Sequence, residues 1–254
     1  MDLSGRRGAC HPNLVPCEVR EALEAGHESA NHMEQIAMDM GNLLRCQFPA
    51  LADRAHELRE LGLVARMRKG GQLLYEELGL ETAVDGPTWG SDTSRGWAAM
   101  AIGFAPELTL RARLRLVRPF AEDPHFAVRE WAWLSIRPHI VPDVPAAVVL
   151  LEPWARSSSD RARRFASEVT RPRGVWSVHL TSLKRDPGIA LPLLHPLRAD
   201  RSRYVQDSVS NWLNDASRTR SDWVIELCTD WLSNCDSPAT RRICRRALRS
   251  RGSG

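Results

Sequence analysis

The sequence predicts an all-α protein built from repeated pairs of helices, and three observations support this prediction. Strand signals are weak, because the 254 residues include only 5 Phe and 2 Tyr and no hairpin dipeptide separates two alternating runs. Apolar residues recur at helical spacing in many segments of the chain. A sequence motif also recurs in the second half, which is typical of helical repeat proteins.

The first third of the chain contains three segments with helical periodicity. Residues 28–45, 50–66 and 71–79 place apolar side chains three or four positions apart, which predicts amphipathic helices. Residues 85–94 are rich in Gly, Pro, Ser and Asp and predict a loop. We expect residues 1–16 to be an irregular N-terminal segment and residues 17–254 to form a single domain.

Three segments of the second half align with one another. They are VREWAWLSIRP from Val128, ARRFASEVTRP from Ala162 and VQDSVSNWLND from Val205, which start 34 and 43 residues apart. A weaker fourth copy begins near Ala239. Units of this length with two helices each are typical of HEAT-like solenoids. We therefore expect a HEAT-like superhelix with a concave basic face, whose best-defined repeats lie within residues 120–250. An aspartate precedes each of the three segments in an N-cap-like position: Asp123, Asp160 and Asp200.

Composition argues against several classes of protein. No run of 18 apolar residues is present to span a membrane, and the N-terminus lacks the apolar stretch of a signal peptide. The six cysteines are scattered without a C-x-x-C pair, which argues against a zinc site and fits a reduced cytoplasmic protein. We expect neither a metal nor a cofactor.

The positive charge of the chain is almost entirely arginine. Lys69 and Lys184 are the only lysines, and the net charge is +4. Arginine stays protonated and binds phosphate through two parallel donors, so clusters of arginine favour a nucleic-acid partner. A solvated, unpaired helix face is the alternative interpretation. The arginines that we expect to contact phosphate are Arg129, Arg163, Arg164, Arg171, Arg173, Arg203, Arg218 and Arg220.

The repeat alignment places polar side chains at matching positions. Leu134, Glu168 and Asn211 are equivalent, while Glu130 lies four residues before Leu134 and Asp215 four residues after Asn211. Residues four apart share a helix face, so these side chains predict a polar stripe along the solenoid. Carboxylates can stabilise a cationic sugar and orient an attacking water. As an alternative, the same acids are solvent-facing or capping groups.

Two stretches carry a family resemblance, RFASEVTRPRGVW at 164–176 and YVQDSVSNWLND at 204–215. With the residues around them, roughly 120–232, they resemble the AlkC branch of the AlkC/AlkD-like DNA alkylation-repair proteins. The resemblance implies a HEAT-like DNA glycosylase that removes alkylated bases from duplex DNA. It implies that Glu168, Trp176 and Asp215 surround the damaged nucleotide, and that Arg163 or Arg164 contacts the DNA backbone.

The sequence departs from the family pattern next to the first repeat. AlkC-like proteins tend to have a glutamate just before the Phe-Ala-Val-Arg stretch, where this chain has His125. The resemblance to the AlkD branch, in which a catalytic aspartate lies near the position of Glu130, implies that Glu130 supplies the missing carboxylate. An indole holds a cation through its face, so Trp131 and Trp133 are further pocket candidates beside Trp176, with core packing as the alternative.

Lysine scarcity bears on the reaction type. A lyase step needs an amine that forms a Schiff base, and neither lysine lies in a catalytic context. We therefore expect a monomeric, monofunctional alkylbase DNA glycosylase whose partner is double-stranded DNA with alkylated bases. Two alternatives remain: a non-catalytic HEAT-like protein that recognises damaged or branched DNA, and a protein-interaction scaffold.

Overall fold

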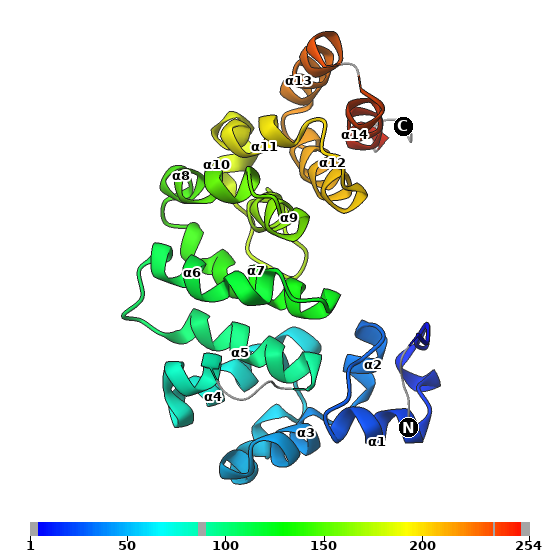
Figure 1. Cartoon of the computed structure of the whole chain (residues 1–254), viewed down its shortest axis with the longest axis vertical. Coiled ribbons are helices and arrows are strands. Elements are labelled where there is room, and N and C mark those ends of the chain that lie inside the picture. Colours follow the sequence, from blue (N-terminus) through cyan, green and yellow to red (C-terminus); the bar gives the residue numbers. More distant parts are fainter. Residues whose placement is uncertain (1–4, 86–89, 236, 250–254) are drawn as a thin grey trace. The chain divides into compact units, whose positions relative to one another are not determined.

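A computed structural model describes residues 5–85, 90–235 and 237–249 (Figure 1). These residues form helices joined by turns and loops, with no strand among them, so the predicted all-α fold is confirmed. The chain divides into two compact units, residues 1–135 and residues 136–254. Among the described residues, every helix is too short or too polar to span a lipid bilayer.

The first unit is assembled around the pair α4 and α5. A Cβ atom at Gly70 of α4 would lie 2.2 Å from Nε1 of Trp97 on α5, so the two helices approach closely only because this side chain is missing. Trp97 is fully buried by that approach. The elements of the unit are η1 (Pro12–Leu14), α1 (Cys17–Glu24), α2 (His32–Ala37), α3 (Met40–Gln47), η2 (Pro49–Leu58), α4 (Leu63–Asp85), α5 (Asp92–Phe104), α6 (Leu110–Ala121) and α7 (Phe126–Ile140) up to Ser135.

The predicted helices of this unit are wrong in their bounds. Residues 28–45 divide into α2 and α3, because the Asp39 carboxylate accepts backbone hydrogen bonds and begins a new helix there. Residues 50–66 are a 3-10 helix and the start of α4, separated by a turn in which Glu60 has a left-handed φ of 44°. Residues 71–79 lie inside α4, which begins earlier, at Leu63, and has a non-helical backbone at Gly79 (φ 75°), where the predicted segment ends. Residues 86–89 of the predicted loop lie outside the described residues, and α5 already begins at Asp92.

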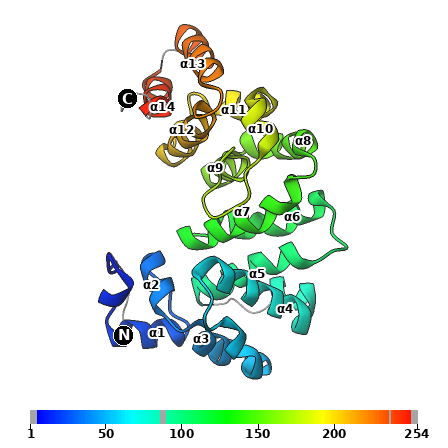
Figure 2. The same cartoon turned by 180° about the vertical axis from the view of Figure 1, so that it is seen from behind.

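The second and third aligned copies lie in the second unit, in α9 and α12, whereas the first copy, residues 128–138, lies mostly in the first unit. Helix α12 packs between α9 and α14, as both views show (Figures 1 and 2). Glu168 and Asn211 each lie nine residues after the N-cap residue of their helix, Ser159 or Ser202, so their predicted equivalence is confirmed. The elements are the end of α7, α8 (Val144–Ala155), α9 (Asp160–Val169), α10 (Thr181–Arg185), η3 (Pro187–Ala190), α11 (Leu191–Leu197), α12 (Arg203–Ser217), α13 (Ser221–Asn234) and α14 (Pro238–Ala247).

Two of the aspartates that mark the repeats have a different role from the predicted one. Serine, not aspartate, occupies the N-cap of α9 and α12. Asp160 is the first residue of α9, and it accepts a hydrogen bond from Ser202 Oγ at 2.7 Å. Asp200 accepts from Ser202 N at 2.8 Å and pairs with Arg163. These two aspartates therefore recur at similar positions because they contact the next helix or its preceding loop, and not because they cap a helix.

Arg163 joins two successive repeats. Its Nε and Nη2 donate to the carboxylate of Asp200 at 2.6 and 3.0 Å, and its Nη1 donates to the carbonyls of Ser157 and Ser158 at 2.9 Å each. Gln206, at the equivalent position of α12, donates to the Asp200 carbonyl at 2.7 Å. These bonds fix the loops that precede α9 and α12.

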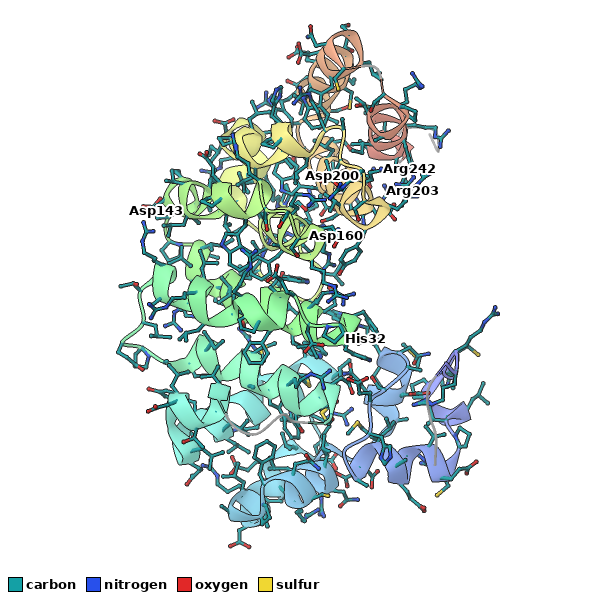
Figure 3. All side chains as sticks on the ribbon, viewed as in Figure 1. His32, Asp143, Asp160, Asp200, Arg203 and Arg242 are labelled. Atoms are coloured by element: carbon teal, nitrogen blue, oxygen red, sulfur yellow. The ribbon has the colours of Figure 1, made fainter. Side chains whose placement is uncertain are left out.

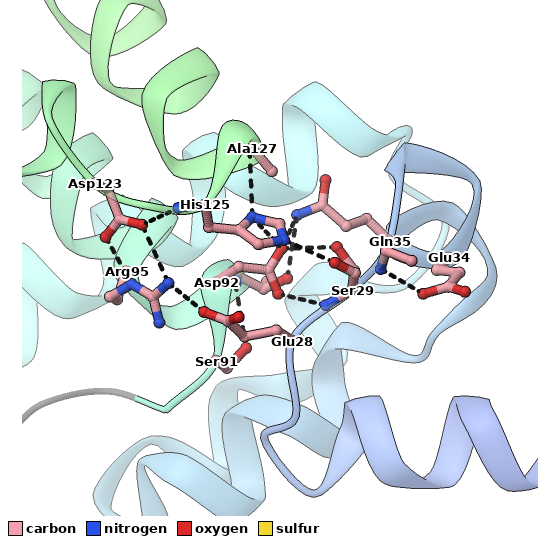
Figure 4. Close-up of polar contacts among 12 residues, drawn as sticks. Glu28, Ser29, Glu34, Gln35, Ser91, Asp92, Arg95, Asp123, His125 and Ala127 are labelled. Atoms are coloured by element: carbon pink, nitrogen blue, oxygen red, sulfur yellow. Dashed lines mark hydrogen bonds and ion pairs between the residues drawn. The ribbon is translucent and has the colours of Figure 1, made fainter. Parts of the chain in front are cut away.

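The first unit contains the same arrangement. Arg95 of α5 donates to both carboxylate oxygens of Asp123 at 2.8 and 3.2 Å (Figure 4). It also donates to the Gly90 carbonyl at 3.2 Å. Asp123 in turn accepts from His125 N at 2.7 Å, as Asp200 accepts from the backbone two residues later. An arginine that binds its own preceding loop and the next aspartate is therefore a repeated structural element of this chain.

Candidate functional site

Glu168 and Asp215 are joined by one arginine in the second unit. Arg171 Nη1 donates to Glu168 Oε1 at 2.7 Å, and Arg171 Nε donates to Asp215 Oδ2 at 2.9 Å. Glu168 lies in the last turn of α9, Asp215 lies near the end of α12, and Arg171 is the second residue after α9. The structure thus brings together two of the predicted acids around a shared cation.

Glu168 is buried with both of its oxygens engaged. Its Oε2 accepts from Ser208 Oγ at 2.7 Å, and Arg164 Nη2 lies 3.6 Å from the same oxygen. Burial alone raises the pKa of Glu168, but the charges of Arg164 and Arg171 outweigh it, together with hydrogen bonds from Arg171 and Ser208. The net pKa is therefore lowered below the ordinary 4.5, and the side chain is a carboxylate at neutral pH.

Asp215 differs from Glu168 in having one uncommitted oxygen. Its Oδ2 binds Arg171, while Oδ1 accepts no hydrogen bond from the described part of the chain. The residue is 7% exposed, so this carboxylate lies at the edge of the buried cluster. Of the two acids, Asp215 is the one with an oxygen available to a water or to a ligand.

Trp176 lies in the loop of residues 170–180, which connects α9 to α10. It is 53% exposed and has a left-handed φ of 58°, a conformation that is uncommon for a bulky residue. Among the tryptophans that the structure describes, it alone is exposed. Its neighbours Val175 and Val178 are also about half exposed. The loop therefore presents an indole and two aliphatic side chains to solvent.

Trp131 and Trp133 are buried, which favours core packing, and their assignment to a pocket stays a prediction. They are 0% and 3% exposed and belong to the core of the first unit. Trp133 Nε1 donates to Glu130 Oε2 at 2.7 Å, which gives the buried indole a polar partner. The two indoles are two positions apart and so lie on different sides of α7, and both are buried. The assignment of Glu130 to catalysis remains a prediction.

His125 immediately precedes α7 and contacts the chain between α1 and α2, a role that the sequence did not indicate. Its Nδ1 accepts from Ala127 N at 3.3 Å, and its Nε2 contacts the Ser29 carbonyl at 2.7 Å (Figure 4). Buried Asp92 lies 3.5 Å from Nδ1 and accepts hydrogen bonds from Ser29 Oγ and Gln35 Nε2. His125 is thus part of a polar network with Ser29 and Asp92.

Several of the arginines expected to contact phosphate are engaged inside the protein. Arg163 is buried and committed to Asp200, so its predicted phosphate contact is corrected to a structural one. Arg164 is buried over the ring of Tyr204 at 4.9 Å, next to Glu168. Arg171 bridges the two acids. Arg129 donates to the carbonyls of Asp123 and Pro124, and Arg220 pairs with Asp222 at 3.1 Å and binds the Arg185 carbonyl.

Other predicted arginines are accessible. Arg203, the first residue of α12, and Arg218, just after its end, are exposed, and Arg173 is half-buried. Figure 3 labels Arg203 with Arg242, Asp200 and Asp160 on the same side of the second unit. Arg242 is held at 2.7 Å by Asp207. Arg203 and Arg218 are therefore the best placed of the predicted phosphate contacts.

Helix α14 and its last turn add cations that are not among the arginines singled out above as phosphate contacts. Arg249 Nη2 donates to Asn211 Oδ1 at 2.9 Å. Burial and the charge of Arg246 lower the pKa of Arg249, and Asp215 opposes them. Arg171 and Arg218 add to the lowering, so cations gather around the end of α12. The basic composition of the tail was the only sequence signal for this cluster. In the described residues, no group of three or more His, Cys, Asp or Glu side chains is placed to hold a metal ion.

Comparisons with known proteins show what this chain is similar to. No family model matches it. The uncharacterized protein YhaZ of Bacillus subtilis (strain 168) is 29% identical over 201 residues, which are 78% of this chain and 55% of that protein. The chain is also similar to Pseudomonas fluorescens alkylpurine DNA glycosylase AlkC bound to DNA containing an abasic site analog, with a TM-score of 0.67 and 23% identity.

The structural likeness covers 91% of this chain and 64% of the AlkC chain. This chain therefore spans about half the length of YhaZ and less than two thirds of the AlkC chain. The likeness shows the fold, and the predicted all-α, HEAT-like fold class is confirmed by it.

Proposed function

We propose that this protein is an AlkC-like DNA glycosylase that hydrolyses the N-glycosidic bond of cationic N-alkylated bases in double-stranded DNA. The observation that carries the proposal is the pair of acids, Glu168 and Asp215, held by Arg171 at the start of the loop that exposes Trp176. The fold shared with a DNA glycosylase supports it.

The proposed chemistry uses the charge that the lesion already carries. Alkylation at a ring nitrogen makes the base cationic and a good leaving group, so the transition state places positive charge on the deoxyribose. A carboxylate next to that sugar stabilises the charge and accepts a proton from the attacking water. Asp215 is suited to this role because its Oδ1 is uncommitted.

Glu168 acts through its charge and through Arg171. Both of its oxygens are engaged, so we assign it to electrostatic stabilisation and to holding Arg171 against Asp215. Its lowered pKa keeps it ionised at neutral pH, where a neutral acid would not stabilise a cationic sugar. Removing its charge is therefore expected to lower the rate as well as the stability.

Trp176 supplies an exposed aromatic face. A cation over an indole gains about 1–2 kcal/mol when water is excluded, which corresponds to roughly 5–30-fold in rate. Its exposure of 53% leaves the ring accessible to the cationic base or sugar. We propose that Arg203, Arg218 and Arg249 bind the phosphates beside it, which makes the affinity dependent on salt.

A base-release assay on methylated duplex DNA, with the products separated by chromatography, tests the proposal. We expect the wild-type protein to release methylated bases. Asp215→Asn should lower the single-turnover rate by about 10²–10⁴-fold. Asp230→Asn is the matched control, because Asp230 is an exposed aspartate on α13 of the same unit. It should leave the rate unchanged.

Two outcomes would favour other functions. Salt-dependent DNA binding without base release would identify a non-catalytic DNA-binding protein. Affinity that does not fall with salt would point to a scaffold for other proteins.

The monofunctional reaction is tested on the same products: abasic sites should appear without strand breaks until alkali is added. Lys69, the one lysine of the first unit, is paired with Glu57 at 3.1 Å.

A further inference from the structure

Arg137 is a fully buried arginine that binds the loop carrying Trp176. It lies in the second unit near the end of α7 and is 0% exposed. Its Nε and Nη2 donate to the Val178 carbonyl at 3.0 and 2.9 Å, and its Nη1 donates to the Val169 carbonyl at 2.9 Å. One guanidinium therefore holds the last residue of α9 and the far side of the loop at a fixed separation.

The loop between these two carbonyls needs such support. Trp176 occupies a left-handed conformation, which is costly for a residue with a large side chain. Gly174 packs directly against the support: a Cβ atom there would lie 3.1 Å from Arg137 Cζ and 2.2 Å from Ser177 Oγ. Leu180 N closes the loop by donating to the Pro172 carbonyl at 3.1 Å.

The charge of Arg137 also reaches the candidate acids. Burial, followed by the charge of Arg171, lowers the pKa of Arg137 to about 10, while Glu168 and Asp215 raise it. Arg137 is therefore still a cation at neutral pH, behind the acid pair. It is 0% exposed and its donors face backbone carbonyls, so it does not contact a ligand itself.

We propose that Arg137 is a positioning residue, which clamps Val169 and Val178 and thereby holds Trp176 in the conformation that the reaction uses. The inference rests on the proposed glycosylase function. Arg137 binds Val169, which is next to Glu168 at the end of α9. This one buried side chain therefore sets the position of the Trp176 indole relative to the acid pair.

The test compares Arg137→Lys with Arg113→Lys. Lysine keeps the charge of Arg137 but cannot span two carbonyls with one ammonium group. Arg113 is the matched control, since it is a buried arginine of the first unit that donates to the carbonyls of Ile102 and Ala105. For Arg137→Lys we expect kcat for base release to fall about 10–100-fold, with KM within about twofold, because the reacting groups are misplaced.

A second variant and a second readout keep the test decisive. Gly174→Ala pushes the loop away from Arg137 without removing the cation, and should lower kcat in the same way. Acrylamide quenching of Trp176 fluorescence, taken as the difference from the matching Trp176→Phe protein, should change in both variants and not in Arg113→Lys. Wild-type kcat and quenching in both variants would overturn the proposal. If the wild-type protein releases no base, the proposed glycosylase function fails, while the quenching experiment still decides whether Arg137 positions Trp176.

Discussion

The Glu168→Gln variant tests whether the negative charge of buried Glu168 stabilises the folded protein. Glutamine preserves the shape of the side chain and one acceptor oxygen, but removes the charge that faces Arg171 at 2.7 Å and Arg164 at 3.6 Å. Removing one partner of a buried ion pair costs about 3–5 kcal/mol. Asp215 still pairs with Arg171 at 2.9 Å, so we expect the lower end of that range, about 3 kcal/mol.

Glu152→Gln is the control for this substitution. Glu152 also has an arginine four residues away in sequence, Arg156, but their closest atoms are 3.8 Å apart and the side chains are 38% and 57% exposed. Solvent screens such a pair, so its loss should cost less than about 1 kcal/mol. Urea unfolding followed by far-UV circular dichroism gives both free energies of unfolding under the same conditions.

The stability lost in Glu168→Gln is expected to depend on pH in one direction. The folded-state pKa of Glu168 is lowered, so its contribution to stability is fully present above the ordinary value of 4.5 and is lost as pH falls through the folded-state pKa. The difference between wild type and Glu168→Gln should therefore be constant near neutral pH and shrink in acid well below pH 4.5. A difference no larger than that of Glu152→Gln, or one that grows in acid, would refute the reasoning.

Three further substitutions separate the roles of the exposed and buried side chains. Trp176→Ala should lower base release by roughly 5–30-fold and leave the melting temperature unchanged, because the indole is exposed. Arg163→Ala should cost about 3–5 kcal/mol of unfolding free energy by leaving buried Asp200 unpaired, with no change in the salt dependence of DNA binding. Arg203→Ala should leave the unfolding free energy unchanged, because Arg203 is exposed. It should lower the magnitude of the slope of log DNA affinity against log salt concentration by about 0.9. An unchanged slope for Arg203→Ala, or a changed one for Arg163→Ala, would contradict the assignment.

The fold and the repeat register were predictable because both depend on local periodicity. Helical spacing marks the apolar face of each helix. The repeat alignment placed Glu168 and Asn211 at equivalent helix positions, and both lie nine residues after their N-caps, Ser159 and Ser202. Helix bounds in the first third were less predictable. They depend on single turns, such as the cap at Asp39, that periodicity does not detect.

The sequence could not predict which charges are buried, because burial depends on partners far along the chain. Arg163 and Arg203 both belong to arginine-rich helix starts. Arg163 is buried because Asp200, which is 37 residues away, lies opposite it, whereas Arg203 is exposed. A residue-by-residue pattern treats both as phosphate contacts, and only the packing of α9 against α12 separates them.

Arg137 shows why an apolar setting can conceal a functional side chain. It follows Ile136 in an apolar stretch of α7 and is not among the residues that the sequence pattern singles out. The structure buries it completely, and its three hydrogen bonds to backbone carbonyls account for that burial, since an unpaired charge would not remain there. The Val169 carbonyl ends α9, and the Val178 carbonyl belongs to a loop whose irregular path is not encoded by any period. A loop that must hold Trp176 in a left-handed conformation needs a rigid support from behind, and a planar cation with several fixed donors provides one where a lysine would not.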